Sequence, residues 1–443
     1  MPFNTDQQTQ DDLNIFGRHG SDSLYALFNH TFTRGGAAVL EECFRYPLSD
    51  AGQINRRSGI IREMALAKVD FPWKPELFDQ AEQYLVNTDE RTKLRASERG
   101  VAGKIAGLIA EDSEYKTIHK GVAALVEILR KLRAFADDRP GSFGMAKELD
   151  VLLGEIGLQP VLQERQTGKL SFEAVAEYDV ILRFRQRDIV RRLLQQVYLL
   201  DMYVSVAKVA RQRGFAFAEA LPRERHTISL EGCYHPQVKN AVANSLEITP
   251  ESNLLFLTGA NMAGKSTFMK SLGIALFLAH IGLPVPALSM RFSVRDAIYT
   301  TINLPDNLGM GASHFYAEVL RVKKIARELG QGKSLFVIFD ELFRGTNVKD
   351  AYEATVALAT AFAGRRDSTF VISTHIIEAG DVLKQRYPNI RFNYLPTRLV
   401  EGKPVYTYTL DEGITADRHG MIIITNEGIL GILEEGKPKI SDI

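Results

Sequence analysis

A phosphate-binding loop constrains this chain more than any other stretch. Residues 259–267 read Gly-Ala-Asn-Met-Ala-Gly-Lys-Ser-Thr and match the pattern G-x-x-x-x-G-K-[ST]. The apolar run from Leu254 to Thr258 precedes the loop, and helix formers from Phe268 to His280 follow it. The pattern is meaningful in this strand–loop–helix context. We therefore predict a nucleotide-binding α/β domain here, and not a glycine-rich turn that fits by chance.

The backbone and two side chains of the loop indicate how ATP and Mg²⁺ would be held. Backbone N–H groups around Gly264 converge on phosphate oxygens, and the N-terminus of the next helix adds partial positive charge. Lys265 would reach the β and γ phosphates, and Ser266 would offer its hydroxyl to Mg²⁺. The predicted nucleotide-binding residues are Gly259, Ala260, Asn261, Met262, Ala263, Gly264, Lys265, Ser266 and Thr267.

A second apolar strand carries the acidic half of the site. The run from Ser334 to Glu341 ends in two carboxylates, as a Walker B strand does. Asp340 would serve the metal, and Glu341 would polarise the attacking water as general base. Because a water-activating base follows the metal ligand, an ATPase is favoured over a P-loop kinase.

A third apolar strand, from Ser368 to His375, ends in a histidine. In a parallel sheet the carboxyl ends of the strands line one crevice. We therefore expect His375 near the γ-phosphate as its sensor. A purely structural role for this histidine is the alternative.

Composition and charge exclude few partners. Lys plus Arg and Asp plus Glu number 54 each, so the formal charge is zero. Such a balance neither requires nor forbids a DNA-binding patch. Cys43 and Cys233 have no metal-ligand or redox spacing. With no apolar run of about eighteen residues and no signal-peptide core at the N-terminus, we expect a cytoplasmic protein without membrane contact.

The chain before the loop reads as helical. An apolar stripe spaced by three and four residues runs from Ile118 to Ala136 and indicates a packed helix. A second periodic stretch, Glu173 to Arg213, predicts a lever helix of roughly 60 Å if unbroken. Gly35-Gly36 would either break a helix or allow close packing.

A cluster of arginines, Arg183-Phe-Arg-Gln-Arg187, lies inside this predicted lever. It could be a phosphate-contacting stripe. A solvated helix face balanced by nearby carboxylates is the alternative that we favour. Charge alone therefore does not decide whether the chain binds DNA.

The character of the sequence changes near residue 217. We predict a polar tail over 1–20, an all-α domain over 21–216 and an α/β P-loop domain over 217–443. Further expected elements of the last domain are a strand at Thr227–Leu230, another at Arg295–Ile302, an edge strand at Tyr406–Leu410 and a final helix at Thr425–Leu433.

Several of these motifs together resemble the MutS mismatch-repair family. The family's P-loop contains Asn-Met, its Walker B strand continues with Arg-Gly-Thr, and a Thr-His switch follows. The corresponding stretches here are 258–267, 340–347 and 373–375. A weaker similarity to the start of the MutS core domain covers Leu27 to Arg57. The resemblance therefore spans almost the whole chain.

The resemblance implies an ABC-type ATPase in which two subunits sandwich each nucleotide. Asn261 would face the γ-phosphate, and His375 would be the switch histidine. Ser313 matches the signature serine that reaches the partner's ATP, although His314 replaces the family's threonine. The implied partners are DNA, a second copy of the chain and a repair protein.

Departures from the family pattern leave two functions open. Ala260 and Ala263 replace a proline and a glycine, and Ala263 is tolerable only with negative φ. We expect no mismatch-reading or connector domain, and the stretch 85–175 is short for a complete DNA clamp. One hypothesis is a dimeric DNA-binding ATPase of mismatch repair or a related process. The other is an ATP-dependent switch for a protein partner that has lost its DNA surface.

Overall fold

The structure is a computed structural model that describes residues 3–17, 22–94, 110–138, 144, 146–164, 170–302, 314–343, 346–400, 403–415 and 432. The chain divides into two compact units. The sheet unit comprises Met1–Ala26, Tyr46–Ser58 and Arg213–Ile443, and the helical unit comprises Leu27–Arg45 and Gly59–Gln212. Both classes of structure predicted from the sequence, a helical region and a mixed α/β region, are therefore confirmed.

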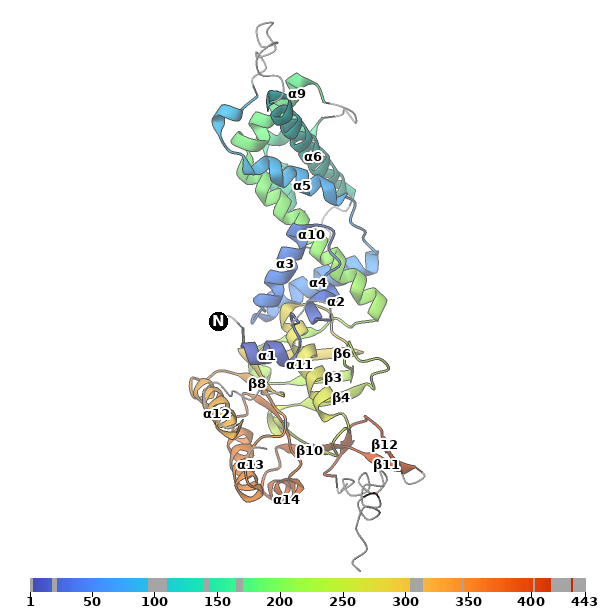
Figure 1. Ribbon diagram of the computed structural model, residues 1–443, viewed down its shortest axis with the longest axis vertical. Coiled ribbons are helices and arrows are strands. Elements are labelled where there is room, and N and C mark those ends of the chain that lie inside the picture. Colours follow the sequence, from blue (N-terminus) through green and yellow to red (C-terminus); the bar gives the residue numbers. More distant parts are fainter. Residues whose placement is uncertain are drawn as a thin grey trace, which may run out of the picture. The chain divides into compact units, whose positions relative to one another are not determined.

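The described part of the helical unit consists mainly of α-helices, of which α6 and α10 are long (Figure 1). Its helices are α3 (Arg34–Arg45), α5 (Pro75–Val86), α6 (Ala110–Asp138), α7 (Ala146–Leu153), α8 (Gln159–Leu162), α9 (Phe172–Asp179) and α10 (Arg187–Arg213). Helices α2 (Leu24–Phe28) and α4 (Ala51–Ala67) begin in the sheet unit and run into this one. The predicted stripe on α6 is buried from Ile118 to Leu132, which confirms its packing role.

The predicted lever over Glu173–Arg213 is not one unbroken α-helix, because a π-helical turn at Val180–Arg185 separates α9 from α10. Its wider winding is seen in the bond from the Gln186 N–H to the Ile181 carbonyl, 2.8 Å long and spanning five residues. Such turns are rare and change which side chains face the core. Here the turn directs Arg183 inward.

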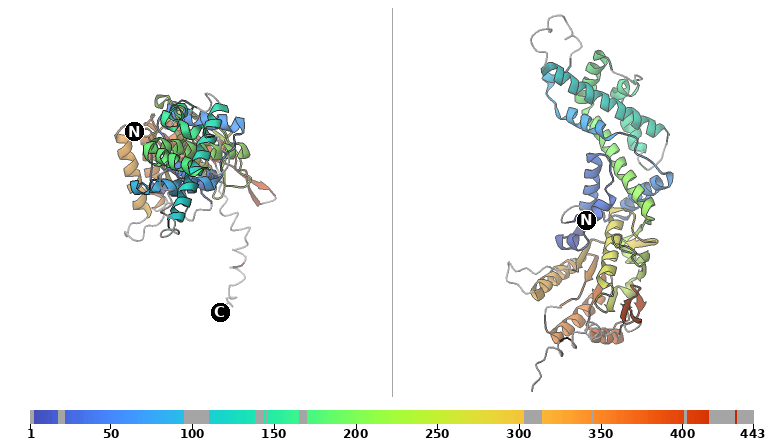
Figure 2. Two further views of the ribbon diagram at one scale, coloured as in Figure 1. Left: turned by 90° about the horizontal axis from the view of Figure 1, so that it is seen from above. Right: turned by 45° about the vertical axis from the view of Figure 1, so that its right-hand side comes forward.

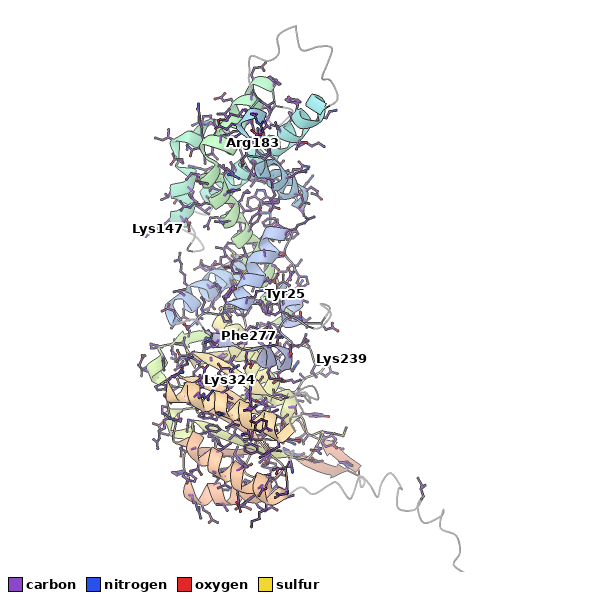
Figure 3. All side chains as sticks on the ribbon, turned by 60° about the vertical axis from the view of Figure 1, so that its left-hand side comes forward. Tyr25, Lys147, Arg183, Lys239, Phe277 and Lys324 are labelled. Atoms are coloured by element: carbon purple, nitrogen blue, oxygen red, sulfur yellow. The ribbon has the colours of Figure 1, made fainter. Side chains whose placement is uncertain are left out.

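Arg183 is therefore neither a solvated residue nor a phosphate contact, contrary to both sequence interpretations. It is 1% exposed and pairs with the fully buried Asp179 at 2.7 Å. Its guanidinium also donates to the Thr92 hydroxyl at 2.9 Å and carbonyl at 2.8 Å. The Tyr84 hydroxyl donates to the second oxygen of Asp179 at 2.6 Å. Because the buried charges are paired and hydrogen-bonded, the desolvation cost is offset. Arg183 is labelled in Figure 3.

A buried carboxylate on α10 holds the start of α3. Asp201 accepts hydrogen bonds from the backbone N–H groups of Phe32 (3.0 Å) and Thr33 (2.8 Å) and from the Thr33 hydroxyl (2.7 Å). A Cβ on Gly36 would lie 2.3 Å from the Asp201 carboxylate. Gly36 lies within α3, so close packing, and not helix breaking, is its role.

In the described part of the sheet unit, a seven-stranded sheet has the order β1-β7-β8-β9-β5-β10-β13. Neighbouring strands are parallel except β10 and β13. The strands are β1 (Asn4–Thr5), β5 (Leu254–Gly259), β7 (Ala297–Thr301), β8 (Leu335–Phe339), β9 (Thr369–Ser373), β10 (Ile390–Leu395) and β13 (Asp411–Glu412). The four predicted apolar strands of this sheet are confirmed as β5, β7, β8 and β9.

Helices cover both faces of this sheet. Strand residues such as Phe256, Val337 and Phe370 pack with α12 (His314–Gly330), α13 (Val348–Ala363) and α14 (Ile377–Arg386). These three helices lie along one flank of the unit in Figure 1. On the opposite face lies α11 (Lys265–Ile281), where Gly273 approaches Ile338. Both faces are covered, which explains why the strands read as continuous apolar runs.

The sheet unit also contains a second sheet and a hairpin. The second sheet has the order β2 (Glu219–Leu221), β6 (Ser289–Ser293), β3 (Ile228–Cys233) and β4 (Asn244–Ile248). Strand β3 confirms the expected strand near Thr227. Strands β11 (Thr397–Val400) and β12 (Lys403–Tyr406) form a hairpin that projects from the unit (Figures 1 and 2).

Two predictions at the C-terminal end fare differently. The edge strand predicted over Tyr406–Leu410 is wrong beyond Tyr406, because β12 ends there. Tyr408 adopts a left-handed φ of 57°, which a strand cannot contain. The helix predicted over Thr425–Leu433 lies outside the described residues apart from residue 432.

The N-terminal residues do not form the tail that the sequence analysis expects. Strand β1 pairs in parallel with β7, and helix α1 (Gln7–Asp12) follows it. Residues 1–26 and 46–58 thus cluster with the sheet unit, unlike the predicted ranges 1–20 and 21–216. The pairing of β1 with β7 joins residues almost 300 positions apart in the chain, so no local sequence pattern could predict it. Within the described ranges, no helix combines the length and apolarity needed to span a membrane.

Candidate nucleotide-binding site

The three motifs singled out in the sequence end on neighbouring strands. The P-loop follows β5, Asp340 and Glu341 follow β8, and His375 follows β9. These strands are parallel and have the order β8-β9-β5. Their carboxyl ends therefore lie side by side, where open α/β sheets bind ligands.

The loop reaches its shape through a few left-handed positions. Gly259 has φ of 150°, Met262 of 70° and Gly264 of 99°. Ala263 is not among the residues with positive φ, so the condition that its Cβ imposes is met. Gly264 caps α11, which begins at Lys265. The helix N-terminus thus faces the loop and offers its partial positive charge to an anion.

Lys265 is folded back into the loop. Only 5% of it is exposed, and its Nζ donates to the carbonyls of Gly259 at 2.9 Å and Ala260 at 3.2 Å. Burial lowers the pKa of Lys265, whereas the nearby charges of Glu341 and Asp340 raise it. The ammonium group is therefore preorganised inside the curve of the loop.

Ser266 and Asp340 meet as a candidate metal pair. The Ser266 hydroxyl donates to Asp340 Oδ2 at 2.5 Å. Burial raises the pKa of Asp340, although the hydrogen bond from Ser266 counters the effect. Among the described residues, Asp340 Oδ1 is a buried oxygen without a hydrogen-bond partner. A carboxylate and a hydroxyl are oxygen ligands of the kind that Mg²⁺ prefers, so the pair fits the predicted cation.

Glu341 stands on a strained turn beside this pair. It has φ of 51°, and Phe343 has φ of 65°. A left-handed conformation costs a residue with a side chain about 1–2 kcal/mol. The Glu341 N–H donates to the Ser373 carbonyl at 3.0 Å, which ties the turn to β9. Strain of this kind is typical of functional sites, and here it delivers Glu341 to the pocket wall.

A pocket of about 630 Å³ opens over the loop. Its phosphate end is lined by loop residues and Glu341. A second wall consists of Cys233, His235, Val238, Lys239, Asn240, Ala241, Val242, Asn244 and Tyr408. Figure 3 labels Lys239 in this wall. The volume is sufficient for a nucleotide-sized ligand.

Sequence reasoning missed this second wall. Tyr408 lies so close to the loop that a Cβ on Gly264 would be 2.9 Å from its ring. Asn244 holds the tyrosine by donating to its carbonyl at 2.9 Å and by accepting from the Leu410 N–H at 2.7 Å. The strand-breaking Cys233-Tyr-His-Pro236 was the one local signal. Tyr408 gave none, because tertiary contact alone brings it across from Gly264.

Two predicted residues are not placed in the pocket. His375 follows β9 and is exposed, and it is not among the residues that line the pocket. Ser313 lies outside the described residues. Asn261 and Met262 do line the pocket, and Met262 is 75% exposed.

Comparison with protein families gives two matches. Residues 8–207 match MutS domain III, and residues 255–437 match MutS domain V, an ABC-type ATPase domain. The two matches together cover most of both structural units. They leave the chain between 208 and 254 unassigned.

Several proteins named DNA mismatch repair protein MutS are similar to the chain. The one from Staphylococcus haemolyticus is 27% identical over 394 residues, or 85% of this chain and 43% of that protein. The one from Thermus thermophilus is 31% identical over 281 residues, or 61% and 33%. The one from Persephonella marina is 28% identical over 263 residues, or 57% and 30%. This chain thus spans less than half the length of these relatives. With a MutS domain III followed by a MutS domain V, the chain belongs to the MutS family.

Proposed function

We propose that this chain binds ATP and hydrolyses it. The observation that carries the proposal is the meeting of the P-loop and Glu341 in one pocket, with Asp340 hydrogen-bonded to Ser266 of the loop. The match of residues 255–437 to an ABC-type ATPase domain supports it.

Each residue of the phosphate end has a proposed role. The loop N–H groups and Lys265 bind the phosphate oxygens, which take the place of the carbonyls that Lys265 now contacts. Ser266 and Asp340 would hold Mg²⁺, which when bound neutralises charge on the β and γ phosphates. His375 is the proposed sensor of the γ-phosphate.

Glu341 is the proposed general base. It orients a water molecule and takes a proton from it as the water oxygen bonds to the γ-phosphorus. The bond from that phosphorus to the β–γ bridging oxygen breaks, and ADP and phosphate leave. Most of the rate enhancement comes from positioning and charge stabilisation.

The second wall of the pocket supports a site for the base of the nucleotide. Val238 and Val242 offer apolar contact there, and the Tyr408 ring offers a stacking face. A pocket lined both by an aromatic ring and by Lys265 suits a ligand with an aromatic end and an anionic end.

A dimer follows from the proposed role of Ser313, which would contact the nucleotide of a second copy. We propose that two copies enclose DNA in the cytoplasm, in mismatch repair or a related process; the names of the relatives, DNA mismatch repair protein MutS, support the process. The alternative is a switch that uses the same dimer to regulate a protein partner. The buried environment of Arg183 favours this alternative, because it removes one candidate phosphate contact.

Steady-state phosphate release at a series of protein concentrations tests the proposal. We expect Mg²⁺-dependent turnover that Glu341→Gln reduces at least a hundredfold, with ATP still bound. The matched control is Glu353→Gln, which changes an exposed glutamate on α13 of the same unit. Retained turnover in Glu341→Gln would remove the assigned base.

The dimer and the DNA ligand are tested in the same assay. Ser313→Ala should lower turnover more than ATP affinity, and unchanged turnover would argue against the shared site. Duplex, mismatched, single-stranded and four-way-junction DNA are added at two salt concentrations, since phosphate contacts weaken with salt. Stimulation of ATP turnover by one of these DNA structures would identify that structure as the ligand. Indifference to every DNA would favour the protein-partner switch.

A further inference from the structure

The carboxylate of Asp6 joins two helices of the sheet unit. It caps α1 by accepting from the Thr9 N–H at 3.1 Å and the Thr9 hydroxyl at 2.9 Å. The same carboxylate faces Arg321 and Lys324 of α12. The N-terminal residues thus contact a helix more than 300 positions along the chain. Figure 3 labels Lys324 on this helix.

Asp6 contacts α12 through two ion pairs, one with Arg321 and one with Lys324. Both terminal nitrogens of Arg321 donate to Asp6, one to each carboxylate oxygen. Lys324 Nζ donates to Asp6 Oδ2 at 2.6 Å. Arg321 is only 9% exposed, and its Nη2 also donates to the Thr300 carbonyl at 2.8 Å. Although burial alone would raise the pKa of Asp6, the two cations hold it well below its ordinary value.

Helix α1 also fastens the end of β7, the strand that precedes α12 in the chain. The Thr9 hydroxyl accepts from the Thr300 N–H at 3.0 Å. Asp12 Oδ2 accepts from the Thr300 hydroxyl at 2.7 Å and from the Ile302 N–H at 2.9 Å. The N-terminal segment therefore anchors β7 and α12, the two elements that flank residues 303–313.

The first turn of α12 contacts the turn that carries Glu341. The ring centroids of Phe315 and Phe343 are 5.6 Å apart. Phe343 is the second left-handed residue of that strained turn and lies two positions after Glu341. Because close-packed cores transmit displacement, a shift of α12 reaches Glu341 through this ring pair. In sequence, α12 also begins directly after Ser313.

We propose that Asp6 is a positioning residue for ATP hydrolysis, which anchors α12 through Arg321 and Lys324 and thereby holds the Glu341 turn in its working conformation. The inference rests on the proposed ATPase function. Asp6 itself lies on the N-terminal segment and does not line the nucleotide pocket. Its loss should therefore reduce turnover and leave ATP affinity unchanged.

The variant Asp6→Asn isolates the anchor. Asparagine caps helices as well as aspartate does, so α1 keeps its N-cap while the ion pairs are lost. The turnover number is measured by phosphate release, and ATP affinity by titration with a fluorescent ATP analogue. We expect turnover to fall about tenfold, since a displacement of 1 Å can cost about a hundredfold. Affinity should change less than about twofold.

Further variants separate positioning from stability. Asp296→Asn is the matched control, because the Asp296 side chain is 13% exposed, pairs with Arg223 at 2.9 Å and accepts from the Ser334 N–H at 2.8 Å, and neither partner lies on α12. Asp296→Asn should leave the turnover number unchanged even when its thermal stability equals that of Asp6→Asn. The double variant Asp6→Asn with Arg321→Ala should be no slower than Arg321→Ala alone, because both remove one coupled contact. If Asp6→Asn does not fold, Lys324→Ala tests the same anchor from the exposed side of α12.

The outcomes distinguish this inference from the proposed function. Full turnover in folded Asp6→Asn would overturn the inference, as would a loss equal to that of Asp296→Asn at equal loss of stability. If Glu341→Gln also hydrolyses ATP normally, the proposed function has failed instead. Because the pKa of Asp6 is low, the defect should be constant between about pH 6 and pH 9. A defect that disappears within that range would contradict the ion-pair anchor.

Discussion

Tyr408 offers the sharpest test of the nucleotide pocket, because sequence patterns did not reveal it. We predict that Tyr408→Ala weakens ATP binding and leaves the turnover number at saturating ATP nearly unchanged. Its ring lines the pocket beside Gly264 of the loop, and we propose that it contacts the base of the nucleotide and not the reacting γ-phosphate. An interaction made equally in ground and transition states changes KM without changing kcat.

The expected loss of ATP affinity follows from the strength of base stacking and from the exposure of the Tyr408 ring. Removing an aromatic ring from a stacked base costs about 1–3 kcal/mol, which corresponds to roughly a 5- to 150-fold loss of affinity. Tyr408 is 45% exposed, so solvent competes with the base and we expect the lower half of that range, about tenfold. Alanine is no worse than tyrosine at φ of 57°, so backbone strain adds nothing.

Titration with a fluorescent ATP analogue, followed by phosphate release at saturating ATP, checks this prediction. Tyr406→Ala is the control, because Tyr406 is the neighbouring tyrosine and does not line the pocket. Asn244→Ala should lower ATP affinity less than Tyr408→Ala does, since it releases the backbone of Tyr408 without removing the ring. Affinity within twofold of the parent in Tyr408→Ala, or a lost kcat at normal affinity, would refute the assignment of the second wall of the pocket to the base.

Three further predictions concern the phosphate end and the helical unit. Lys265→Ala should reduce ATP affinity at least about a hundredfold, because it removes a buried charge from the loop; calorimetry that finds normal affinity would discredit the P-loop assignment. Ser266→Ala should abolish the Mg²⁺ dependence of binding while nucleotide without metal still binds, and an unchanged response to chelator would contradict the metal pair. Asp201→Asn should lower the free energy of unfolding by about 2–3 kcal/mol, because an amide nitrogen then faces N–H donors. Burial raises the pKa of Asp201, so the folded state binds this proton more tightly than the unfolded state. The contribution of Asp201 to stability therefore declines as pH rises from the ordinary aspartate value through the raised one. Urea unfolding across that range should show less decline in the Asn variant, and an equal slope would count against the prediction.

The phosphate end of the site could be predicted because its geometry is local. Strand, loop and helix are consecutive in sequence, so the residues from Leu254 to His280 determine the P-loop without distant help. The same holds for Asp340 and Glu341 at the end of an apolar strand. Parallel strands bring such ends to one edge, so the meeting of Ser266 with Asp340 followed from strand type alone.

Other features depend on partners that no local pattern specifies. Arg183 reads as surface charge, yet a π turn and hydrogen bonds to Thr92, 91 positions earlier in the chain, place it in the core. Residues 4 and 5 are polar, yet they form an edge strand because β7 offers unpaired backbone groups.

The sequence by itself therefore determined the nucleotide chemistry, the two classes of structure and the membership of a P-loop family. Each of these depends on sequence patterns shorter than about thirty residues, in which residues close in the sequence contact one another. Only the tertiary structure decided that Tyr408 completes the pocket, that Arg183 is buried and that Asp6 anchors α12. In those cases the energy lies in desolvation and pairing between residues 90 to 315 positions apart, and these contacts exist only after the chain has folded.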